Sequence, residues 1–444
     1  MNGGLSMVEM KSGYKMTEVG VIPEDWEVKN VSESCLIKAR IGWQGLKKSE
    51  YMSSGDYLLI TGTDFDNGQV NWKSCAYVSK ARYEQDSNIK IRPQDILISK
   101  DGTIGKVAYL GMIPKAGTLN SGIFVIRAND RKIDQVFLSK IFMSFYFEDF
   151  LNRLVAGSTI NHLYQKDFVK FCFPLPNSEE QAAIATALSD VDSLISALTK
   201  KIEKKKAIKQ GLMQQLLTGK KRLPGYEKNR EPVQTEWGAI PKDWKTLSIG
   251  KCCSIKARIG WQGLKKSEYL SSGEYVLVTG TDFLNGRIDW KSCVYVSKKR
   301  YEQDANIQIV KHDILITKDG TIGKVAFLDD VPCLGTLNSG IFVVRSHSEE
   351  LDQCYLSKIF ESFIFDAFLE SLVAGSTINH LYQKDFVHFN FPVPPTMSEQ
   401  TAIANILSDC DSEIAALEEK RDKYKEIKQG MMQQLLTGKI RLIK

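Results

Sequence analysis

Several residues of this 444-residue chain resemble parts of catalytic motifs, but none has the spacing that the chemistry needs. Gly105-Lys106 would end a phosphate-binding loop of the form G-x-x-x-x-G-K-[ST] only with glycine in place of Lys100 and a hydroxyl residue in place of Val107. The tract ending in Lys100 would suit a metal-dependent nuclease only with a carboxylate two residues earlier, where Ile98 stands. We therefore expect neither a P-loop nor a nuclease site.

Nucleophilic and metal chemistry are also missing from the pattern. Residues 157–159 (Gly-Ser-Thr) lack the G-x-S-x-G spacing of a nucleophile elbow. No G-x-G-x-x-G follows a strand, and there is no Asn-Pro-Pro-aromatic stretch of the kind that amino-methyltransferases use. Nine cysteines without a C-x-x-C pair and five scattered histidines favour reduced thiols over a disulfide framework or a zinc site. The expectation is a non-catalytic chain with no metal or cofactor of its own.

The overall composition is that of an ordinary globular protein, with 43% hydrophobic and 25% charged residues. The formal charge of +6 is permissive for nucleic acid, although many unrelated enzymes share such a balance. No run approaches the roughly 18 uncharged apolar residues of a membrane span. Residues 1–16 are polar and lack the apolar core of a signal peptide. We expect a cytoplasmic protein of two or three domains with a flexible N-terminal tail.

Three polar segments suit DNA better than catalysis. In the first, cations that can bind phosphates surround a Trp-Gln pair between glycines, and Arg and Gln can also pair with base edges. The second is a glycine-rich turn whose backbone N–H groups can approach an anion. The third is a polar run of the kind that begins a helix, where phosphate binds favourably. The candidate DNA-binding residues are Lys38, Arg40, Trp43, Gln44, Lys47, Lys48, Lys100, Asp101, Thr103, Lys106, Ser158, Thr159, Asn161, His162, Gln165 and Lys166.

Each segment also has a simpler interpretation. Lys47 and Lys48 could form a solvated face, Trp43 could belong to the core, and His162 could cap a helix. Recurrence favours the DNA-binding interpretation, because the same segments return 218 residues later as the longest unchanged stretches between two diverged copies. Recent gene conversion would leave the same pattern. The second set is Lys256, Arg258, Trp261, Gln262, Lys265, Lys266, Lys318, Asp319, Thr321, Lys324, Ser376, Thr377, Asn379, His380, Gln383 and Lys384.

Each copy of about 160 residues predicts a mixed domain. Short apolar runs bounded by turn residues predict strands at 57–61 and 96–98 and again at 275–279 and 314–316. Asp66-Asn67-Gly68 and Asn285-Gly286 predict tight turns. Aromatic and leucine residues at helical spacing over 137–154 and 355–372 predict helices. The fold class is therefore α/β or α+β.

A long helix follows each copy. Candidate capping boxes at Asn177…Glu180 and Thr396…Glu399 precede a heptad seam, and both helices end in Gln-Gln-Leu-Leu-Thr-Gly. Roughly 40 residues give about 60 Å, too long for one small domain, so we expect an antiparallel pair in preference to helices that fold back onto their own domains. The seam residues are Ile184, Leu188, Val191, Ile195, Leu198, Ile202, Ile403, Leu407, Cys410, Ile414, Leu417 and Tyr424.

The predicted organisation is two duplicated globular domains separated by two long helices that form an antiparallel coiled coil with pseudo-twofold symmetry. The expected segments are a tail (1–16), domain 1 (17–176), helix (177–219), linker (220–234), domain 2 (235–394), helix (395–438) and tail (439–444).

Taken together, these motifs make the chain resemble the specificity subunit of a type I restriction–modification system. The resemblance rests on the domain–helix–domain–helix order, the opening Ile-Pro-Glu-Asp-Trp at 22–26 and its counterpart at 240–244, and the Gly-Thr-Ile-Gly-Lys turn at 102–106. Phe-Pro-x-Pro running into Glu-Gln and the terminal Gln-Gln-Leu-Leu-Thr-Gly also match. The match covers the chain after its tail.

The resemblance implies a partner-dependent function. Each domain would be a target recognition domain for one half of a bipartite double-stranded DNA site, and the helices would be spacers that dock two methyltransferase subunits. Those partners would carry S-adenosylmethionine, and motor-nuclease restriction subunits would bring ATP and Mg, in a defence against foreign DNA. Members of the family commonly carry dissimilar recognition domains. The near-identical copies here predict an interrupted palindrome or near-palindrome instead, read with steep salt dependence.

Two alternatives remain. A stand-alone DNA-binding regulator would bind a site without recruiting an enzyme, but it has no evident need of such long seams. A fragment of a self-contained restriction–methylation enzyme would need catalytic motifs that this sequence lacks.

Overall fold

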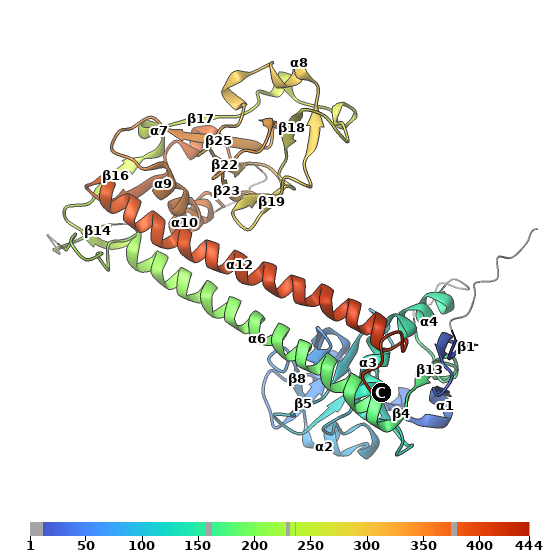
Figure 1. Ribbon diagram of the computed structural model, residues 1–444. Coiled ribbons are helices and arrows are strands. Elements are labelled where there is room, and N and C mark those ends of the chain that lie inside the picture. The colour runs from blue at the N-terminus through green and yellow to red at the C-terminus, as the bar shows by residue number, and fades with distance from the viewer. Residues whose placement is uncertain (1–11, 156–161, 228–230, 236, 374–379, 444) are drawn as a thin grey trace, which may run out of the picture. The chain divides into compact units, whose positions relative to one another are not determined.

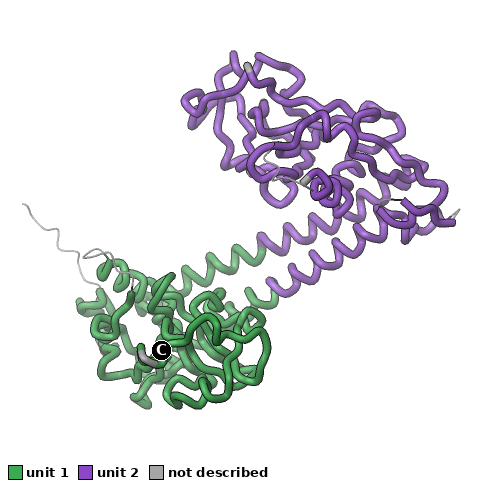
Figure 2. The backbone as a smooth tube through the Cα atoms, turned by 180° about the vertical axis from the view of Figure 1, so that it is seen from behind, with its two compact units in different colours: residues 1–198, 420–444 green, residues 199–419 purple. Residues whose placement is uncertain are grey.

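The computed structural model describes residues 12–155, 162–227, 231–235, 237–373 and 380–443. The chain forms two compact units, residues 1–198 with 420–444 and residues 199–419 (Figure 2). Each unit combines one globular domain with part of each of two long helices. The serial segments expected from the sequence are therefore interleaved, because both helices are shared between the units.

A four-stranded antiparallel sheet in the order β10-β9-β12-β4 lies at the centre of unit 1, and Figure 1 labels its edge strand β4. Side chains alternate between the faces of a strand. Ile96 and Ile98 therefore pack on one face against helices, while Leu97 packs on the other against a second sheet. Burial of both faces explains why the run 96–98 is apolar without a break. The strands are β4 (Cys35–Ala39), β9 (Ile96–Ser99), β10 (Val107–Tyr109) and β12 (Ile123–Ala128).

The second sheet has three strands in the order β11-β5-β8, and β11 pairs with β5 in parallel. These strands are β5 (Tyr57–Ile60), β8 (Ala76–Val78) and β11 (Gly117–Leu119). The turn predicted at Asp66-Asn67-Gly68 joins the short hairpin of β6 (Phe65–Asp66) and β7 (Gln69–Val70). Asn67 and Gly68 have positive φ angles of 48° and 78°, as a type I′ turn requires.

Helices cover the other face of the central sheet. The helical segment predicted at 137–154 is two helices, α3 (Gln135–Phe142) and α4 (Phe145–Val155), because Ser144 interrupts it and its Oγ accepts the N–H of Tyr146. A third short helix, α5 (Gln165–Phe168), buries Phe168 completely. An antiparallel central sheet with helices gathered on one face makes this an α+β domain.

The remaining elements of unit 1 are shorter. They are β1 (Tyr14–Thr17), β2 (Gly20–Pro23), β3 (Glu27–Asn30), α1 (Val31–Ser34), α2 (Lys80–Glu84), β13 (Cys172–Leu175), and the 3₁₀ turns η1 (Gly42–Gln44), η2 (Lys48–Glu50), η3 (Gly62–Asp64) and η4 (Ser87–Ile89).

Unit 2 repeats this architecture with the sheet orders β17-β25-β22-β23 and β21-β18-β24. Its strands are β14 (Pro232–Thr235), β15 (Gly238–Pro241), β16 (Lys245–Ser248), β17 (Cys253–Lys256), β18 (Tyr275–Val278), β19 (Phe283–Leu284), β20 (Arg287–Ile288), β21 (Val294–Val296), β22 (Ile314–Thr317), β23 (Val325–Phe327), β24 (Leu334–Leu337), β25 (Ile341–Ser346) and β26 (Asn390–Val393). Its helices are α7 (Ile249–Cys252), α8 (Lys298–Tyr301), α9 (Gln353–Phe360), α10 (Phe363–Val373) and α11 (Gln383–Phe386), with η5 (Gly260–Gln262), η6 (Lys266–Glu268) and η7 (Ala305–Ile307).

The two long helices are α6 (Ser178–Leu216) and α12 (Met397–Leu435), of 39 residues each. Their antiparallel pairing is visible inside each unit. In unit 2, Lys205 and Lys209 of α6 pair with Glu413 and Asp411 of α12, so residue numbers rise along one helix as they fall along the other. In unit 1, Asp192 of α6 pairs with Lys428 of α12.

Each helix packs first on its own domain and then on the other domain. Ile184 and Leu188 of α6 belong to the core of unit 1, whereas Leu216 belongs to the core of unit 2. Conversely, Ile403 of α12 lies in the core of unit 2 and Leu435 in that of unit 1. The pairing and the fold-back onto the own domain, which the sequence left as alternatives, thus occur together. The pseudo-twofold axis between the domains stays a prediction.

The two capping boxes are only half formed. Asn177 Oδ1 accepts the N–H of Glu180, and Thr396 Oγ1 accepts that of Glu399, as expected for an N-cap. The glutamates do not complete a box. Glu180 is fully buried, accepts a hydrogen bond from Trp26 Nε1 and forms a two-pronged ion pair with Arg441. Glu399 forms the equivalent two-pronged ion pair with Arg222. The residues after each helix are therefore anchored beside the start of the other.

Among the described residues, α6 is long and apolar enough to cross a membrane by length and composition. The sequence had suggested that no stretch comes close, but the first half of this helix is rich in alanine and leucine. Its apolar residues Ile184 and Leu188 lie in the core of unit 1, and Asp192 forms ion pairs with Lys140 and Lys428. In this structure the helix packs against protein.

All nine cysteines are free, and five of them are buried.

Candidate nucleic-acid interface

The glycine-rich turn between β9 and β10 is fixed from beneath by Ser99. This buried hydroxyl donates to the carbonyl of Thr103 and accepts the N–H of Lys106 at 2.9 Å. Gly102 and Gly105 adopt positive φ angles of 69° and 80°, and a Cβ on Gly105 would lie 2.2 Å from a Leu151 methyl. The sequence Gly-Thr-Ile-Gly-Lys is therefore what this turn requires. It leaves the side chains of Thr103 and Lys106 exposed.

The segment that follows α4 in sequence is joined to this turn. His162 forms an isolated β-bridge with Asp101, and the two side chains are hydrogen bonded through His162 Nδ1. The N–H of buried Leu163 donates to the carbonyl of Lys100 at 2.8 Å. Two candidate segments separated by about 60 residues thus form one surface. We name it the turn surface: Lys100, Asp101, Thr103, Lys106, His162, Tyr164, Gln165 and Lys166 in unit 1, and Lys318, Asp319, Thr321, Lys324, His380, Tyr382, Gln383 and Lys384 in unit 2.

Lys100 lies at the inner margin of the turn surface. Its Nζ is 5.1 Å from the ring centroid of Phe124, and partial burial lowers the pKa of the ammonium. Lys318 repeats the contact with Phe342 at 5.1 Å, and the direction of its pKa shift and the cause are the same. These lysines are half-buried, whereas Lys106 and Lys166 are exposed and can reach a phosphate.

The first candidate segment is only partly available to a ligand. Lys38 is exposed on β4, an edge strand, and Lys47 and Lys48 are exposed beyond it. By contrast, Arg40 is 2% exposed, and its guanidinium donates to the carbonyl of Leu119 and the hydroxyl of Thr118. The prediction that Arg40 reads DNA is not supported, because this side chain holds its own loop against β11. Burial lowers its pKa.

Gln44 is the second correction in this segment. It is 6% exposed, and its Oε1 has no hydrogen-bond partner. Arg258 and Gln262 of unit 2 repeat both arrangements, with exposures of 2% and 5%. In this structure the four side chains are buried, and their contacts with bases stay predictions.

Some predicted residues lie outside what the structure describes. Ser158, Thr159 and Asn161, with Ser376, Thr377 and Asn379, fall in the undescribed segments 156–161 and 374–379. The side chains of Trp43 and Trp261 are likewise not described. Their predicted contacts with DNA stay predictions.

The sequence interpretation missed Tyr164 and Tyr382. Both are 55% exposed, and each lies between a predicted contact histidine two residues earlier and a predicted contact glutamine one residue later. An aromatic residue usually belongs to the core, so the residue type alone does not predict that these two side chains are exposed. Their position inside a polar run, between His-Leu and Gln-Lys, was the available signal.

Of the twelve residues of the predicted heptad seam, Ile184, Leu188, Ile403 and Leu407 lie in the cores of the two units. All twelve are buried or half-buried, from Ile184 and Leu188 at 0% to the half-buried Val191 and Tyr424. Ile208 and Ile427, at equivalent points of α6 and α12, remain 44% and 40% exposed. The helices therefore carry apolar side chains on an outer face as well as in the seam.

The described residues hold no cluster of three or more His, Cys, Asp or Glu side chains that could bind a metal. Beside the turn of unit 1 lies a cavity of about 540 Å³, lined by Ile104, Lys106, Phe147, Leu151 and Lys428 among others. Its walls are largely apolar and also carry the charged residues Lys106, Glu148 and Lys428. The exposed lysines of the turn surface suit contact with an extended anion.

Comparison with known proteins gives the same picture. The family described as type I restriction modification DNA specificity domain matches residues 23–210 and 241–429. Two specificity subunits of type I restriction enzymes from Methanocaldococcus jannaschii are similar along the chain: that of MjaVIII is 27% identical over 95% of this chain and 94% of its own, and that of MjaIX is 23% identical over 97% and 96%.

A crystal structure of the type I restriction–modification S subunit from M. genitalium shares the fold, with a TM-score of 0.59, 15% identity and coverage of 96% of this chain and 99% of that one. The double match of the family domain covers most of the sequence and coincides with the two copies of the turn surface. The chain therefore belongs to the family of type I restriction–modification DNA specificity subunits, the non-catalytic components that recognise DNA.

Proposed function

We propose that this chain reads an interrupted DNA site whose two halves are the same short sequence on opposite strands. The observation that carries the proposal is the repetition of the turn surface, with the same residues and the same contacts in both units. The Asp101–His162 pair recurs as Asp319–His380, and the contact of Lys100 with Phe124 recurs as Lys318 with Phe342. Equal surfaces select equal base sequences.

Affinity in this proposal comes from exposed cations and selectivity from neighbouring polar groups. Lys38, Lys47, Lys48, Lys106 and Lys166 are exposed in unit 1, and their counterparts in unit 2 are exposed except for Lys324, which is half-buried. Each cation that neutralises a phosphate releases a counterion, so affinity falls steeply as salt rises. The edge position of β4 and the exposed side chains of the turn leave these charges open to an approaching duplex.

The long helices serve partner subunits in this proposal. Their seam is already filled, yet Ile208 and Ile427 expose apolar surface at equivalent positions, and Leu194 of α6 is 37% exposed. A docking face for a partner on these helices would include such exposed apolar residues. Two such faces fit two methyltransferase subunits, which would supply S-adenosylmethionine. Motor-nuclease subunits would supply ATP and magnesium, and the complex would act on DNA in the cytoplasm.

Selection of duplexes from a randomised library tests the proposal. The purified chain, alone and with the methyltransferase encoded beside it, is incubated with 40-base-pair duplexes, and bound duplexes are sequenced over several rounds. The proposal predicts enrichment of one short motif and its reverse complement at a fixed separation. Two unrelated half-sites would contradict the palindrome, and no enrichment would contradict sequence recognition.

Co-purification decides whether the helices recruit an enzyme. A methyltransferase retained by the chain supports the docking role. A chain that enriches a motif but retains no methyltransferase would instead be a stand-alone DNA-binding regulator.

A further inference from the structure

Tyr164 and Tyr382 stand apart from every other aromatic residue that the structure describes. Of all Phe, Trp and Tyr side chains described, only these two are exposed, each at 55%. They are equivalent residues of the two copies. Chance exposure of one tyrosine on a surface is ordinary, but the same residue at the same exposure in both units indicates a position where an exposed ring is retained.

The exposure of Tyr164 does not result from a loose segment. Leu163 before it is 1% exposed and bonded to the backbone of Lys100, and Phe168 one turn later is fully buried. Tyr164 itself is the N-cap residue of α5, with extended backbone angles. The backbone on both sides of Tyr164 is therefore anchored, so binding costs little backbone freedom there.

Its neighbours make the ring part of a basic surface. The imidazole of His162, itself bonded to Asp101, lies 4.7 Å from the ring of Tyr164, measured between centroids, and Lys166 Nζ lies 5.6 Å from the same ring centroid. In unit 2 the corresponding distances at Tyr382 are 4.5 Å to His380 and 5.6 Å to Lys384. The ring thus lies near both an imidazole and a cation, at similar distances in both units.

We infer that Tyr164 and Tyr382 are contact residues for DNA, one in each half-site, whose rings pack on a sugar or base while the flanking lysines hold phosphates. An aromatic ring in a cationic surface can pack against nucleotides, and its phenol adds one hydrogen bond. This inference rests on the proposed function and adds residues that the sequence interpretation did not include.

Binding of a duplex enriched by the wild-type chain from the randomised library provides the test. Full-length Tyr164→Ala, Tyr382→Ala and the double variant are titrated against it by fluorescence anisotropy. Each single substitution should weaken binding by roughly 5- to 100-fold, and the double substitution by about the product of the two. Equal losses in the two single variants are expected because the two surroundings are the same.

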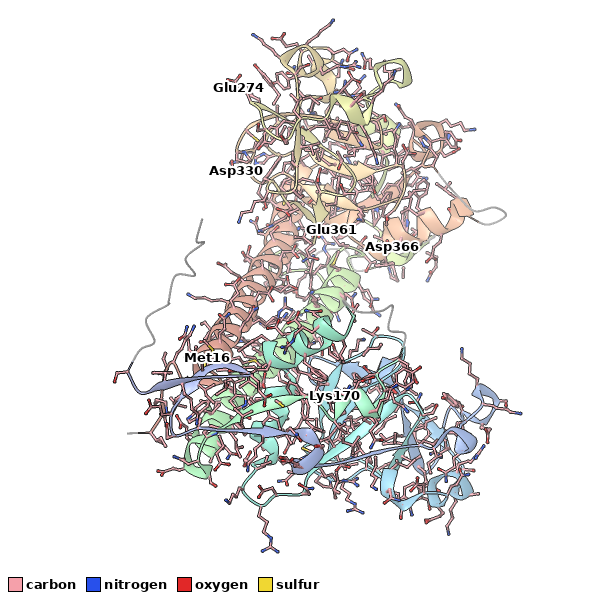
Figure 3. All side chains as sticks on the ribbon, turned by 90° about the vertical axis from the view of Figure 1, so that its right-hand side faces the viewer. Met16, Lys170, Glu274, Asp330, Glu361 and Asp366 are labelled. Carbon is pink, nitrogen blue, oxygen red and sulfur yellow. The ribbon has the colours of Figure 1, made fainter. Side chains whose placement is uncertain are left out.

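The salt dependence of DNA affinity distinguishes a ring that packs on DNA from a cation that neutralises a phosphate. The slope of log affinity against log salt should stay unchanged in Tyr164→Ala and fall by about one in Lys166→Ala. Met16→Ala is the matched control: Met16 is 66% exposed on β1 (Figure 3), so loss of a large exposed side chain there should leave affinity unchanged. Thermal unfolding of the tyrosine variants should match the wild type.

Two results would overturn the inference in distinguishable ways. If both tyrosine variants bind with wild-type affinity and Lys166→Ala binds more weakly, the tyrosines are not contact residues, although the chain still recognises DNA. A wild-type chain that enriches no duplex and binds none would overturn the proposed function and this inference together.

Discussion

At the scale of single residues, burial divides the predicted contact residues into two kinds. Lys47 and Lys48 are free to meet a phosphate, whereas Arg40 is enclosed and donates to Leu119 and Thr118. Residue type and spacing do not distinguish an arginine that reads DNA from one that ties a loop. Only the packing of β11 beneath the loop settles it.

Arg40→Ala should therefore act on stability. It removes buried hydrogen bonds and leaves a cavity, so the free energy of unfolding should fall by roughly 2–4 kcal/mol. Lys48→Ala, in the same segment but exposed, should change stability by less than about 0.5 kcal/mol and lower the salt slope of DNA binding by about one. Thermal unfolding and anisotropy measure both. An Arg40→Ala variant with normal stability and lost binding would contradict the assignment.

The sequence predicted the candidate site in part. Recurrence of whole segments led to the turn at 100–106 and to residues 162–166, and the structure joins these two by the bridge between Asp101 and His162. It could not separate Gln44, which faces inward, from Lys47, or show that Tyr164 faces outward. These orientations depend on contacts with elements distant in sequence.

At the scale of elements, one acidic residue in each unit ties three helices together. Asp192 of α6 binds Lys140 of α3 at 2.7 Å and Lys428 of α12 at 2.6 Å. In unit 2, Asp411 binds Lys358 and Lys209, and Glu361, at the end of α9 (Figure 3), binds the same two lysines. The equivalent residues Asp192 and Asp411 thus each connect a domain helix to both long helices.

Asp192→Asn should weaken this junction. Lys140, whose side chain is 8% exposed, would lose its carboxylate, and we expect unit 1 to lose roughly 1–3 kcal/mol of stability after allowance for solvent at Asp192. Asp190→Asn, two residues earlier on the exposed side of α6, is the control and should be close to neutral. Equal melting behaviour of the two variants would show that the junction contributes nothing.

The matching junction in unit 2 predicts a dependence of stability on pH. Burial raises the pKa of Asp411, but Lys358 and Lys209 outweigh it, so the pKa lies below its usual range. A depressed carboxyl pKa stabilises the folded state above the unfolded value near 4 and loses that contribution as pH falls through the folded value. Unit 2 should therefore lose stability below about pH 4.

Asp411→Asn supplies the comparison for that dependence. The difference in stability between wild type and variant should shrink as the pH falls below about 4. Chemical denaturation at several pH values measures it. A difference that stays constant from pH 7 to pH 3 would contradict the role given to Asp411.

The elements were predicted better than their ends. Heptad spacing predicted both long helices, observed as Ser178–Leu216 and Met397–Leu435, because a seam of apolar residues is local in sequence. The break between α3 and α4 was missed, since it depends on the hydroxyl of Ser144. The capping glutamates were assigned to a local box, whereas distant Arg222 and Arg441 take them.

At the scale of the whole molecule, duplication is the feature with the widest consequence. Two units present one surface each, with the same residues, and two helices offer equivalent outer isoleucines. A family member with dissimilar domains would read two different half-sites. Identical contact segments predict that this chain reads one half-site twice. Tyr164 and Tyr382 should then make the same contact, each in one half-site.

The measurement that tests this claim most directly is a genome-wide map of modified adenines in cells that express the chain with the methyltransferase encoded beside it. We predict one interrupted motif that equals its own reverse complement, with one modified adenine on each strand. Modified sites with two unrelated halves would contradict the claim that the two domains read the same sequence.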